Sequence, residues 1–208
     1  MKTKPKIKKH TVKNTVFRHF VNNVDTHGSY TYGTCFISRV SYLKEPVIWT
    51  AGHVMTDALF PVVLPKFADD KSKWSHRLGG MDISVYGLDF DKKHNFRHPE
   101  EGLPISVFGY PAGSRHLEYR KGFAYIERFD GKWIGRIDSP HEPVVSGMSG
   151  GMVIGHFPDG NKQIGVLATS NSPTELTGDN ISDFSFDFVS IARAIELEKE
   201  LRAARRVF

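Results

Sequence analysis

A serine flanked by glycines is a candidate nucleophile. The segment GMSGG, residues 147–151, carries Ser149 at its centre. A serine hydroxyl is a poor nucleophile until a neighbouring imidazole can take its proton, and a carboxylate must hold that imidazole in one tautomer. Upstream, VIWTAGHVM carries His53 after an apolar run, and GGMDISVYGL carries Asp82 at the head of another. These three side chains could together perform acyl transfer.

The glycines beside Ser149 suit a further part of the same chemistry. With so little side chain nearby, the backbone can turn so that the N–H groups of Gly147 and Ser149 point at one spot and bind the oxyanion of a tetrahedral intermediate. Taken singly, a Gly-Ser-Gly turn, a strand-end His and a strand-start Asp are more often structural than catalytic. Their joint occurrence in the order His, Asp, Ser favours the catalytic interpretation.

Two alternatives use the same residues differently. The pattern G-x-S-x-G also marks the nucleophile elbow of α/β-hydrolases, which needs a helix directly after the serine and an acid and then a histidine later in the chain. Here GMVIGHFPDG predicts a strand and a turn, and only His156 follows Ser149, with no acid between them, so the elbow is rejected. Asp89 and Asp91 are alternative acids, but they follow the strand in a charged loop, so Asp82 is preferred.

The segments TAGHV, DISV and GMSGG, in this order, resemble the signature segments of trypsin-like serine peptidases of the chymotrypsin fold. The resemblance runs from about residue 33 to residue 189, and FGYPAG, residues 108–113, is similar to a segment before the nucleophile in many relatives. The short distance from His53 to Asp82 and the absence of disulfides are closer to the Deg-like and intracellular or viral branches than to digestive enzymes. The resemblance implies two six-stranded Greek-key β-barrels and a serine endopeptidase that acts on a polypeptide substrate.

The resemblance also implies which residues line the specificity pocket. Pro143 and Val144, six and five residues before the serine, would help to form the base of this pocket. Neither is charged, so cleavage after Lys or Arg is not supported. Leu167 stands where glutamyl endopeptidases have a histidine, which disfavours cleavage after Glu. The other expected substrate-binding positions in this segment are Ala168, Thr169 and Ser170. We expect a small or medium apolar residue before the scissile bond.

The residue before the nucleophile departs from the digestive pattern. Digestive relatives have an acid there, which pairs with a new amino terminus after activation cleavage, whereas this chain has Met148. A methionine cannot form that ion pair, and the chain begins with lysines rather than with an apolar segment. We therefore expect activity without zymogen cleavage, with an oxyanion loop that is either ordered from the start or gated by some other contact.

The elements that must position these residues are mostly short strands. Runs of β-branched and aromatic residues between Gly, Pro, Asn and Asp predict about ten of them. They are residues 29–40, 46–54, 59–64, 82–88, 105–110, 122–129, 132–138, 151–157, 163–170 and 184–189. After them, Ser190 can cap a terminal helix with Ile191, Ala194, Ile195 and Leu201 on one face. Many short strands and one helix predict an all-β fold of one or two closed barrels.

These elements give a division of the chain. We assign a basic arm, a first barrel half with His53 and Asp82, a connection, a second barrel half with Ser149, and a C-terminal α-helix. The corresponding ranges are 1–20, 21–97, 98–104, 105–189 and 190–208. We expect the helix to pack on the second barrel and its EKELRAARR end to face solvent.

The arm carries a concentrated positive charge. Of the 28 Lys and Arg residues, seven lie in residues 1–20 without any acid, which leaves 21 basic against 23 acidic residues elsewhere. A solvated tail is the simpler interpretation, because no aromatic residues interleave with the lysines as they do in many nucleic-acid-binding segments. Contact with nucleic acid through the arm is the less favoured alternative. A related alternative for the whole chain is a triad-bearing module that binds nucleic acid or a protein through the arm or the helix.

Composition limits the remaining classes of function. The 208 residues are 39% hydrophobic and can bury a sizeable core. No apolar run approaches the roughly 20 residues that cross a bilayer, and no secretory signal is present, so we expect a cytoplasmic protein without membrane contact. The single cysteine, Cys35, lies in an apolar strand and is expected to be a buried structural thiol.

A metal site is the last candidate from the sequence. His94 and His98 are spaced at i and i+4, but neither a cysteine nor an acidic third ligand stands at a suitable spacing. We therefore expect no metal, and the chemistry of the serine site requires no cofactor.

Overall fold

The computed structural model describes residues 16–21, 31–38, 46–56, 71–112, 114–127, 132–138, 144–170 and 185–206. The strands of the first half are β1 (Val16–Val21), β2 (Thr31–Ser38), β3 (Val47–Thr50), β4 (Trp74–Ser75) and β5 (Ser84–Tyr86). Those of the second half are β6 (Pro104–Gly109), β7 (Glu118–Glu127), β8 (Lys132–Ile137), β9 (Met152–Phe157), β10 (Gly160–Ser170) and β11 (Ser185–Ser190). The helical elements of the described residues are α2 (Gly52–Thr56), α3 (Ile191–Arg205) and the 3₁₀ turns η2 (Lys71–Lys73) and η3 (Leu78–Gly80).

The described strands of the first half form one antiparallel sheet in the order β1-β2-β3-β5-β4. It has five strands, so the six-stranded barrel expected for this half is not confirmed. The predicted strand at residues 59–64 lies outside the described residues, as does the arm before residue 16. The sequence did not indicate β1, which crosses the boundary set after residue 20, nor the short β4.

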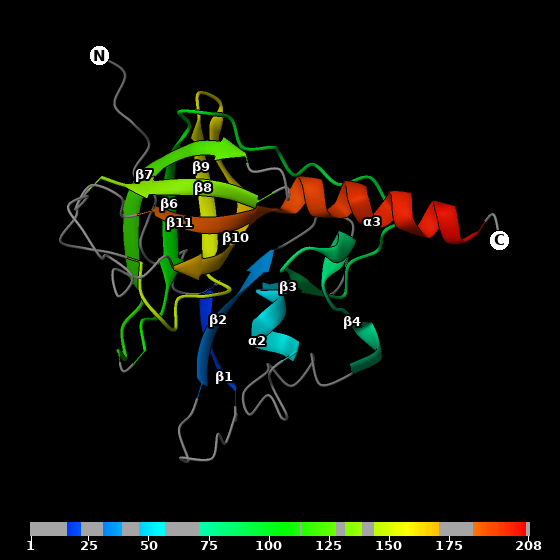
Figure 1. The fold of residues 1–208 in the computed structure, drawn as a ribbon, viewed down its shortest axis with the longest axis horizontal. Helices are drawn as coiled ribbons and strands as arrows, with labels where there is room; N and C mark the ends of the chain where they lie inside the picture. Colours follow the sequence, from blue (N-terminus) through cyan, green and yellow to red (C-terminus); the bar gives the residue numbers. More distant parts are fainter. Residues whose placement is uncertain are drawn as a thin grey trace, which may run out of the picture.

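The second half closes into a barrel. Its six strands follow the order β10-β11-β8-β7-β6-β9, and each pairs antiparallel with its neighbours. This confirms the barrel expected for the second half, and Figure 1 shows it above the sheet of the first half. The barrel interior is filled by apolar side chains, among them Val107, Trp133, Val153, Phe186 and Phe188. Closing the sheet removes its edges and fixes where the loops between its strands emerge.

A second apolar cluster joins the two halves to the terminal helix. Phe36 and Trp49 from the first sheet share it with Met152 and Val166 from the barrel and with Ile195 from α3. Burial of such side chains contributes about 1.5–3 kcal/mol each. The cluster therefore fixes the barrel loops against the sheet.

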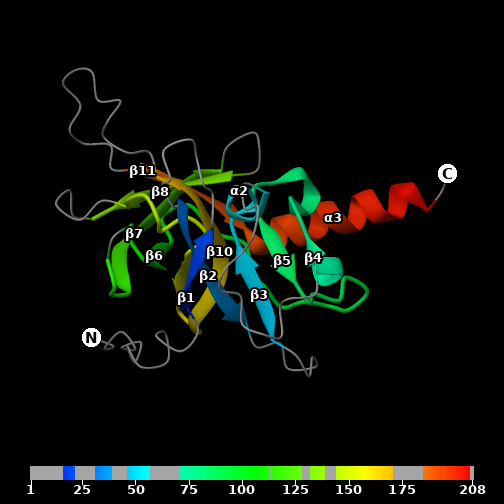
Figure 2. The same ribbon diagram turned by 90° about the horizontal axis from the view of Figure 1, so that it is seen from below.

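Helix α3 follows directly from β11, and the side chain of Ser190 caps it by accepting a hydrogen bond from the N–H of Arg193 at 3.3 Å. Its start contacts β10 and β11, as expected, but its middle packs on η3 of the first half. There the N–H of Gly79 donates to Glu198 Oε2 at 3.0 Å. Figures 1 and 2 both show α3 extending away from the barrel beside the first sheet.

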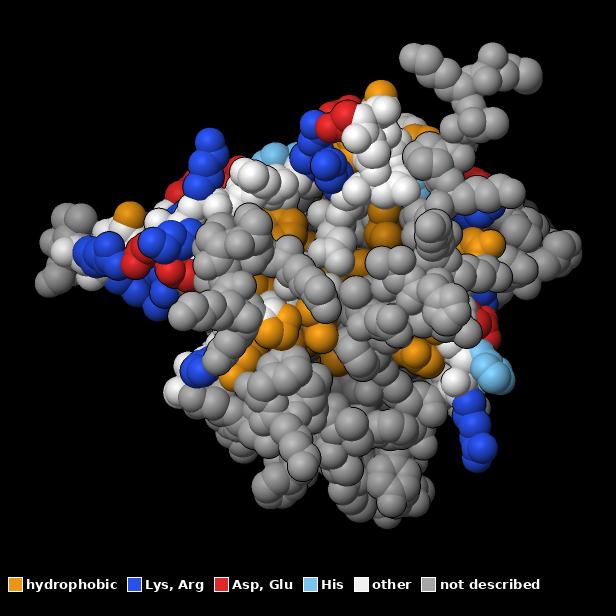
Figure 3. Space-filling model, turned by 180° about the vertical axis from the view of Figure 1, so that it is seen from behind, with side chains coloured by type: hydrophobic (Ala, Val, Ile, Leu, Met, Phe, Trp, Pro, Cys, Tyr) orange, Lys and Arg blue, Asp and Glu red, His pale blue; other side chains and the backbone are white. Residues whose placement is uncertain are grey.

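The last turns of α3 project into solvent. Residues 199–206 are exposed, and charged side chains of both signs gather at this end of the molecule (Figure 3). Leu201, expected on the buried face, is 43% exposed because it lies beyond the surface that the rest of the helix covers. Among the described residues, no helix combines the length and the apolar character needed to span a membrane.

Gly79 and Gly80 offer a matched test of the packing of α3 on η3. Both have positive φ, +60° and +78°, but a Cβ on Gly79 would lie 2.7 Å from the Cβ of Leu197, whereas a Cβ on Gly80 would have no neighbour within 4 Å. We predict that Gly79→Ala lowers the free energy of unfolding by about 3 kcal/mol, from backbone strain plus overpacking. Gly80→Ala should cost only the backbone part, about 1 kcal/mol.

Urea denaturation of the two variants and the wild type measures the difference. Equal losses in the two variants would contradict close packing of α3 on η3.

Candidate active site

His53 lies at the point where the chain leaves β3 and enters the short helix α2. Strand β3 is central in the first sheet and fully buried, so the position of the following turn is well defined. The side chain of His53 is 32% exposed. The imidazole is therefore held at the base of α2 and is partly exposed.

Both oxygens of the Asp82 carboxylate face His53. The backbone N–H of His53 donates to Oδ1 at 2.7 Å, and His53 Nδ1 lies 2.8 Å from Oδ2. An ionised carboxylate only accepts hydrogen bonds, so the proton of the neutral imidazole is on Nδ1 and the acceptor lone pair is on Nε2. The geometry thus makes Nε2 the basic nitrogen.

Close approach of the two residues depends on Gly52. A Cβ at this position would lie 2.8 Å from Asp82 Oδ1 and 3.2 Å from the Asp82 backbone. Any side chain would push the carboxylate away from the N–H of His53. In the sequence AGHV, the glycine before His53 is therefore required for a steric reason.

The environment of Asp82 favours its ionised form. Burial acts to raise the pKa of this carboxyl, but the hydrogen bonds and the charge of His53 lower it by more, with a smaller contribution from the charge of Arg77. The net result is a pKa below the ordinary aspartate value. Asp82 consequently remains a hydrogen-bond acceptor for His53 at neutral pH.

The loop that carries Ser149 is fixed through its carbonyl groups. The carbonyl of Ser146 accepts from the N–H of Ala112 at 2.8 Å, and that of Met148 accepts from the N–H of Gly151 at 2.8 Å. In a trans peptide the C=O and the next N–H point in opposite directions. These two bonds therefore turn the N–H groups of Gly147 and Ser149 away from their carbonyl partners.

Those two N–H groups are the ones expected to bind an oxyanion. Within the described residues, neither donates a hydrogen bond to a backbone or side-chain acceptor. Gly147 has φ of +89°, and a Cβ there would lie 2.4 Å from the N of Ala112, so only glycine fits. Ser149 itself is partly exposed. The backbone is thus arranged so that both donors remain available.

The same loop packs on the end of β3, at the residues that precede His53 in the chain. The N–H of Thr34 donates to the carbonyl of Ser149 at 2.7 Å. A Cβ on Gly150 would lie 2.4 Å from Thr50 Oγ1 and 3.1 Å from the N of Ala51. The backbone of the serine loop therefore contacts residues that immediately precede α2.

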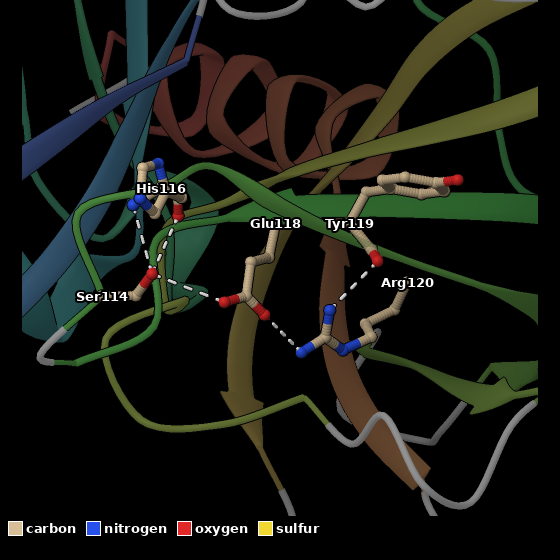
Figure 4. A network of polar contacts seen from close by, with 5 residues as sticks. All are labelled: Ser114, His116, Glu118, Tyr119 and Arg120. Atoms are coloured by element: carbon tan, nitrogen blue, oxygen red, sulfur yellow. Dashed lines mark hydrogen bonds and ion pairs between the residues drawn. The ribbon is translucent and has the colours of Figure 1, made fainter.

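The β6–β7 hairpin supports the loop from the other side, because it carries Ala112. Polar contacts stiffen the hairpin beyond this point, and Figure 4 labels their residues as Ser114, His116, Glu118, Tyr119 and Arg120. The N–H of Ser114 donates to the carbonyl of Pro111 at 3.0 Å, and the hydroxyl of Ser114 accepts from the N–H of His116 at 3.1 Å. Arg120 in turn pairs with Glu118 at 2.7 Å.

The expected specificity residues fall into three groups. Val144 and Leu167 are buried and pack with Phe186 and Phe188, which the sequence did not single out although they alternate along a predicted strand. Ala168 is buried in the cluster between the two halves. Thr169 and Ser170 pair with β11 through the backbone, while their side chains and Pro143 lie outside the described residues.

The alternative acids and the candidate metal pair lie elsewhere. Asp89 accepts from the N–H of Asp91 through Oδ1 at 3.0 Å, and its carbonyl accepts from His94 Nε2 at 2.8 Å. His98 pairs with Glu196 of α3 at 2.8 Å. In the described part of the chain, no three His, Cys, Asp or Glu side chains form a group that could hold a metal ion.

Cys35 is completely buried in the first sheet, and burial raises the pKa of its thiol to about 12. It is therefore a structural residue, as the sequence predicted.

Several solved structures share this arrangement of strands. A thermostable serine protease from an extremophilic microorganism has a TM-score of 0.54 and 13% identity, with 90% of this chain and 96% of that chain covered. The serine endoprotease from Yersinia pestis has a TM-score of 0.56 and 15% identity, with 95% and 67% covered. A mutant of the Tobacco Etch Virus protease has a TM-score of 0.54 and 18% identity, with 93% and 81% covered. The chain has the chymotrypsin fold.

At these identities the likeness establishes the fold alone. No protein-family model and no curated protein matches the sequence. The chymotrypsin fold of this chain therefore stands on the structure, and a reaction must be argued from its own residues.

The lowered pKa of Asp82 gives a prediction about stability. A carboxylate whose pKa is lowered in the folded state stabilises the protein at pH values above the ordinary aspartate pKa of about 3.9. This contribution to stability is lost as the pH falls through the folded-state pKa. We predict that the stability advantage of the wild type over Asp82→Asn shrinks as the pH is lowered below about 4. Urea unfolding of both proteins between neutral pH and pH 3 measures it.

The partner residue provides the control. In a His53→Ala background, Asp82 loses the ring hydrogen bond and the charge that lower its pKa, while its burial remains. The difference in stability between His53→Ala and the double variant His53→Ala, Asp82→Asn should therefore not decrease in acid, or should increase. A gap between wild type and Asp82→Asn that stays constant in acid would contradict the assignment.

Proposed function

We propose that this protein is a trypsin-like serine endopeptidase that hydrolyses peptide bonds through Ser149, His53 and Asp82. The observation that carries the proposal is the double hydrogen bond of Asp82 to His53, which leaves Nε2 as the basic nitrogen. The fixed loop around Ser149 and the chymotrypsin fold support it. A structural Asp–His contact alone would not require two backbone N–H groups to be left available beside a serine.

The mechanism follows from these roles. His53 Nε2 takes the hydroxyl proton of Ser149 as Oγ attacks the scissile carbonyl, and the carbonyl electrons move to oxygen. Asp82 stabilises the imidazolium that forms and keeps Nδ1 protonated. When the intermediate collapses, the C–N bond breaks and His53 gives its proton to the leaving amine. Water then attacks the acyl-enzyme by the same route, releasing the acid and restoring Ser149.

The oxyanion is bound by the N–H groups of Gly147 and Ser149 in this proposal. Each such donor contributes about 3–4 kcal/mol to transition-state stabilisation in comparable enzymes. Because both peptide planes are held by bonds to their carbonyls, the donors need no reorganisation when charge develops.

An activity-based probe tests the nucleophile. A fluorophosphonate should label Ser149 in the folded wild type, because only a serine activated by a base reacts readily. Labelling should be absent in Ser149→Ala and after denaturation, and peptide mapping locates the modified residue. A folded wild type that is not labelled at neutral pH would overturn the proposal and favour the alternative in which the chain binds nucleic acid or a protein without catalysis.

Turnover of casein by variants of two aspartates, Asp82 and Asp89, supplies matched controls for that experiment. Asp82→Asn should lose about four orders of magnitude, since the amide favours the wrong imidazole tautomer. Asp89→Asn should stay within a few fold, because Asp89 contacts Asp91 and not His53. Near-normal turnover by Asp82→Asn would remove Asp82 from the site.

Specificity is the second testable part of the proposal. The expected pocket residues Val144 and Leu167 are uncharged, which favours a small or medium apolar residue before the scissile bond. Sequencing the products of a mixed peptide library should show that preference, with Ser149→Ala as the blank. Dominant cleavage after Lys, Arg or Glu would contradict it.

A further inference from the structure

The hydroxyl of Thr34 joins three segments of the chain at the serine loop. Thr34 is completely buried in β2. Its Oγ1 donates to the carbonyl of Gly147 at 3.0 Å and accepts from the N–H of Tyr110 at 3.0 Å. One hydroxyl thus connects the first sheet, the second-half hairpin and the glycine that precedes Met148.

The backbone of Thr34 is directed to the same place. Its N–H donates to the carbonyl of Ser149 at 2.7 Å, and its carbonyl accepts from Thr50 Oγ1 at 2.8 Å. The backbone of Thr34 is therefore held on both sides, which fixes the point from which its side chain projects. A rigid donor can fix the orientation of a peptide that glycine would otherwise leave free.

Gly147 is the hinge between two peptide planes, and Thr34 acts on both. The plane after Gly147 is held directly, through its carbonyl. The plane before Gly147 carries the N–H expected to bind the oxyanion, and it is held by Ala112 on the hairpin. That hairpin is in turn held by the bond from Tyr110, two residues earlier, to Thr34.

We propose that the Thr34 hydroxyl is a positioning group that holds the Gly147 peptide, and with it the oxyanion hole, in its working orientation. This role rests on the proposed peptidase function. It assigns to a residue outside the three signature segments a contribution to rate, without contact between Thr34 and substrate.

Three substitutions at Thr34 separate the hydroxyl from the volume of the side chain. Thr34→Val keeps the shape and removes the hydroxyl, Thr34→Ser keeps the hydroxyl, and Thr34→Cys keeps only a weak donor. With p-nitrophenyl acetate as substrate, Thr34→Val should lower kcat about 10²-fold, the size of effect seen when one oxyanion donor is lost. KM should stay within about threefold, since substrate binding before charge develops is unaffected. Thr34→Ser should remain within about threefold of wild type in kcat, and Thr34→Cys should fall between the two.

Ser38→Ala is the matched structural control. Ser38 is also buried in β2, accepts from Trp49 Nε1 at 3.0 Å and donates to Gln163 Oε1, but none of these partners is in the serine loop. The substitution should lower thermal stability and leave kcat within about threefold, because the expected cost lies in folding.

The outcomes distinguish this role from the proposed function. Fluorophosphonate labelling of the wild type is measured first, and its absence would overturn both proposals. With the wild type labelled, kcat of Thr34→Val within threefold of wild type would overturn the positioning role alone. An equal kcat loss in Ser38→Ala would also overturn it, because the loss would then reflect general destabilisation. Should Thr34→Val not fold, wild-type kcat in Thr34→Cys would overturn the role, and a partial loss would support it.

Discussion

The site depends on satisfying both oxygens of one partly buried carboxylate. Asp82 remains ionised chiefly because His53 offers it a backbone N–H and a ring N–H at once, and an unpaired buried charge would cost several kcal/mol. This double contact requires a glycine before His53 and a turn that holds Asp82 in a fixed position beside His53. Helix α3 braces that turn through Glu198 and Gly79. The end of the chain thus helps to set the position of an acid in its first half.

The serine loop meets a similar requirement, but the buried acceptors are peptide carbonyls and not a carboxylate. Its carbonyls find donors in two distant parts of the chain, at Thr34 and Ala112, and within the loop itself at Gly151. Buried carbonyls need partners, and satisfying them on one side leaves the N–H groups on the other. The conformation expected to bind an oxyanion therefore results from pairing each buried carbonyl of the loop with a donor, once the closed barrel and the first sheet are packed together.

Local patterns in the sequence predicted part of this and missed the rest for identifiable reasons. The segments around His53 and Asp82 indicated two residues that do lie in contact, and Ser190 marked the start of α3 correctly. Strand β1 was missed because its sequence VFRHFV lies at the end of a basic run that predicted a solvated arm. The packing of α3 on η3 joins Gly79 to Glu198, and no local periodicity encodes a contact across 119 residues. Thr34 was missed because one polar residue within an apolar strand has many possible roles.

Met148 shows how the serine loop can be ordered without an ion pair at the position before Ser149. Its side chain is completely buried in the core of the second barrel, and Gly109 packs so closely on it that a Cβ there would lie 2.9 Å from the Cβ of Met148. An acid at this position would need a cationic partner in the same apolar surroundings, since burying an unpaired carboxylate is costly. A methionine needs none and is held by packing alone. The order of the loop then requires no new amino terminus, and this is the physical reason for expecting activity without zymogen cleavage.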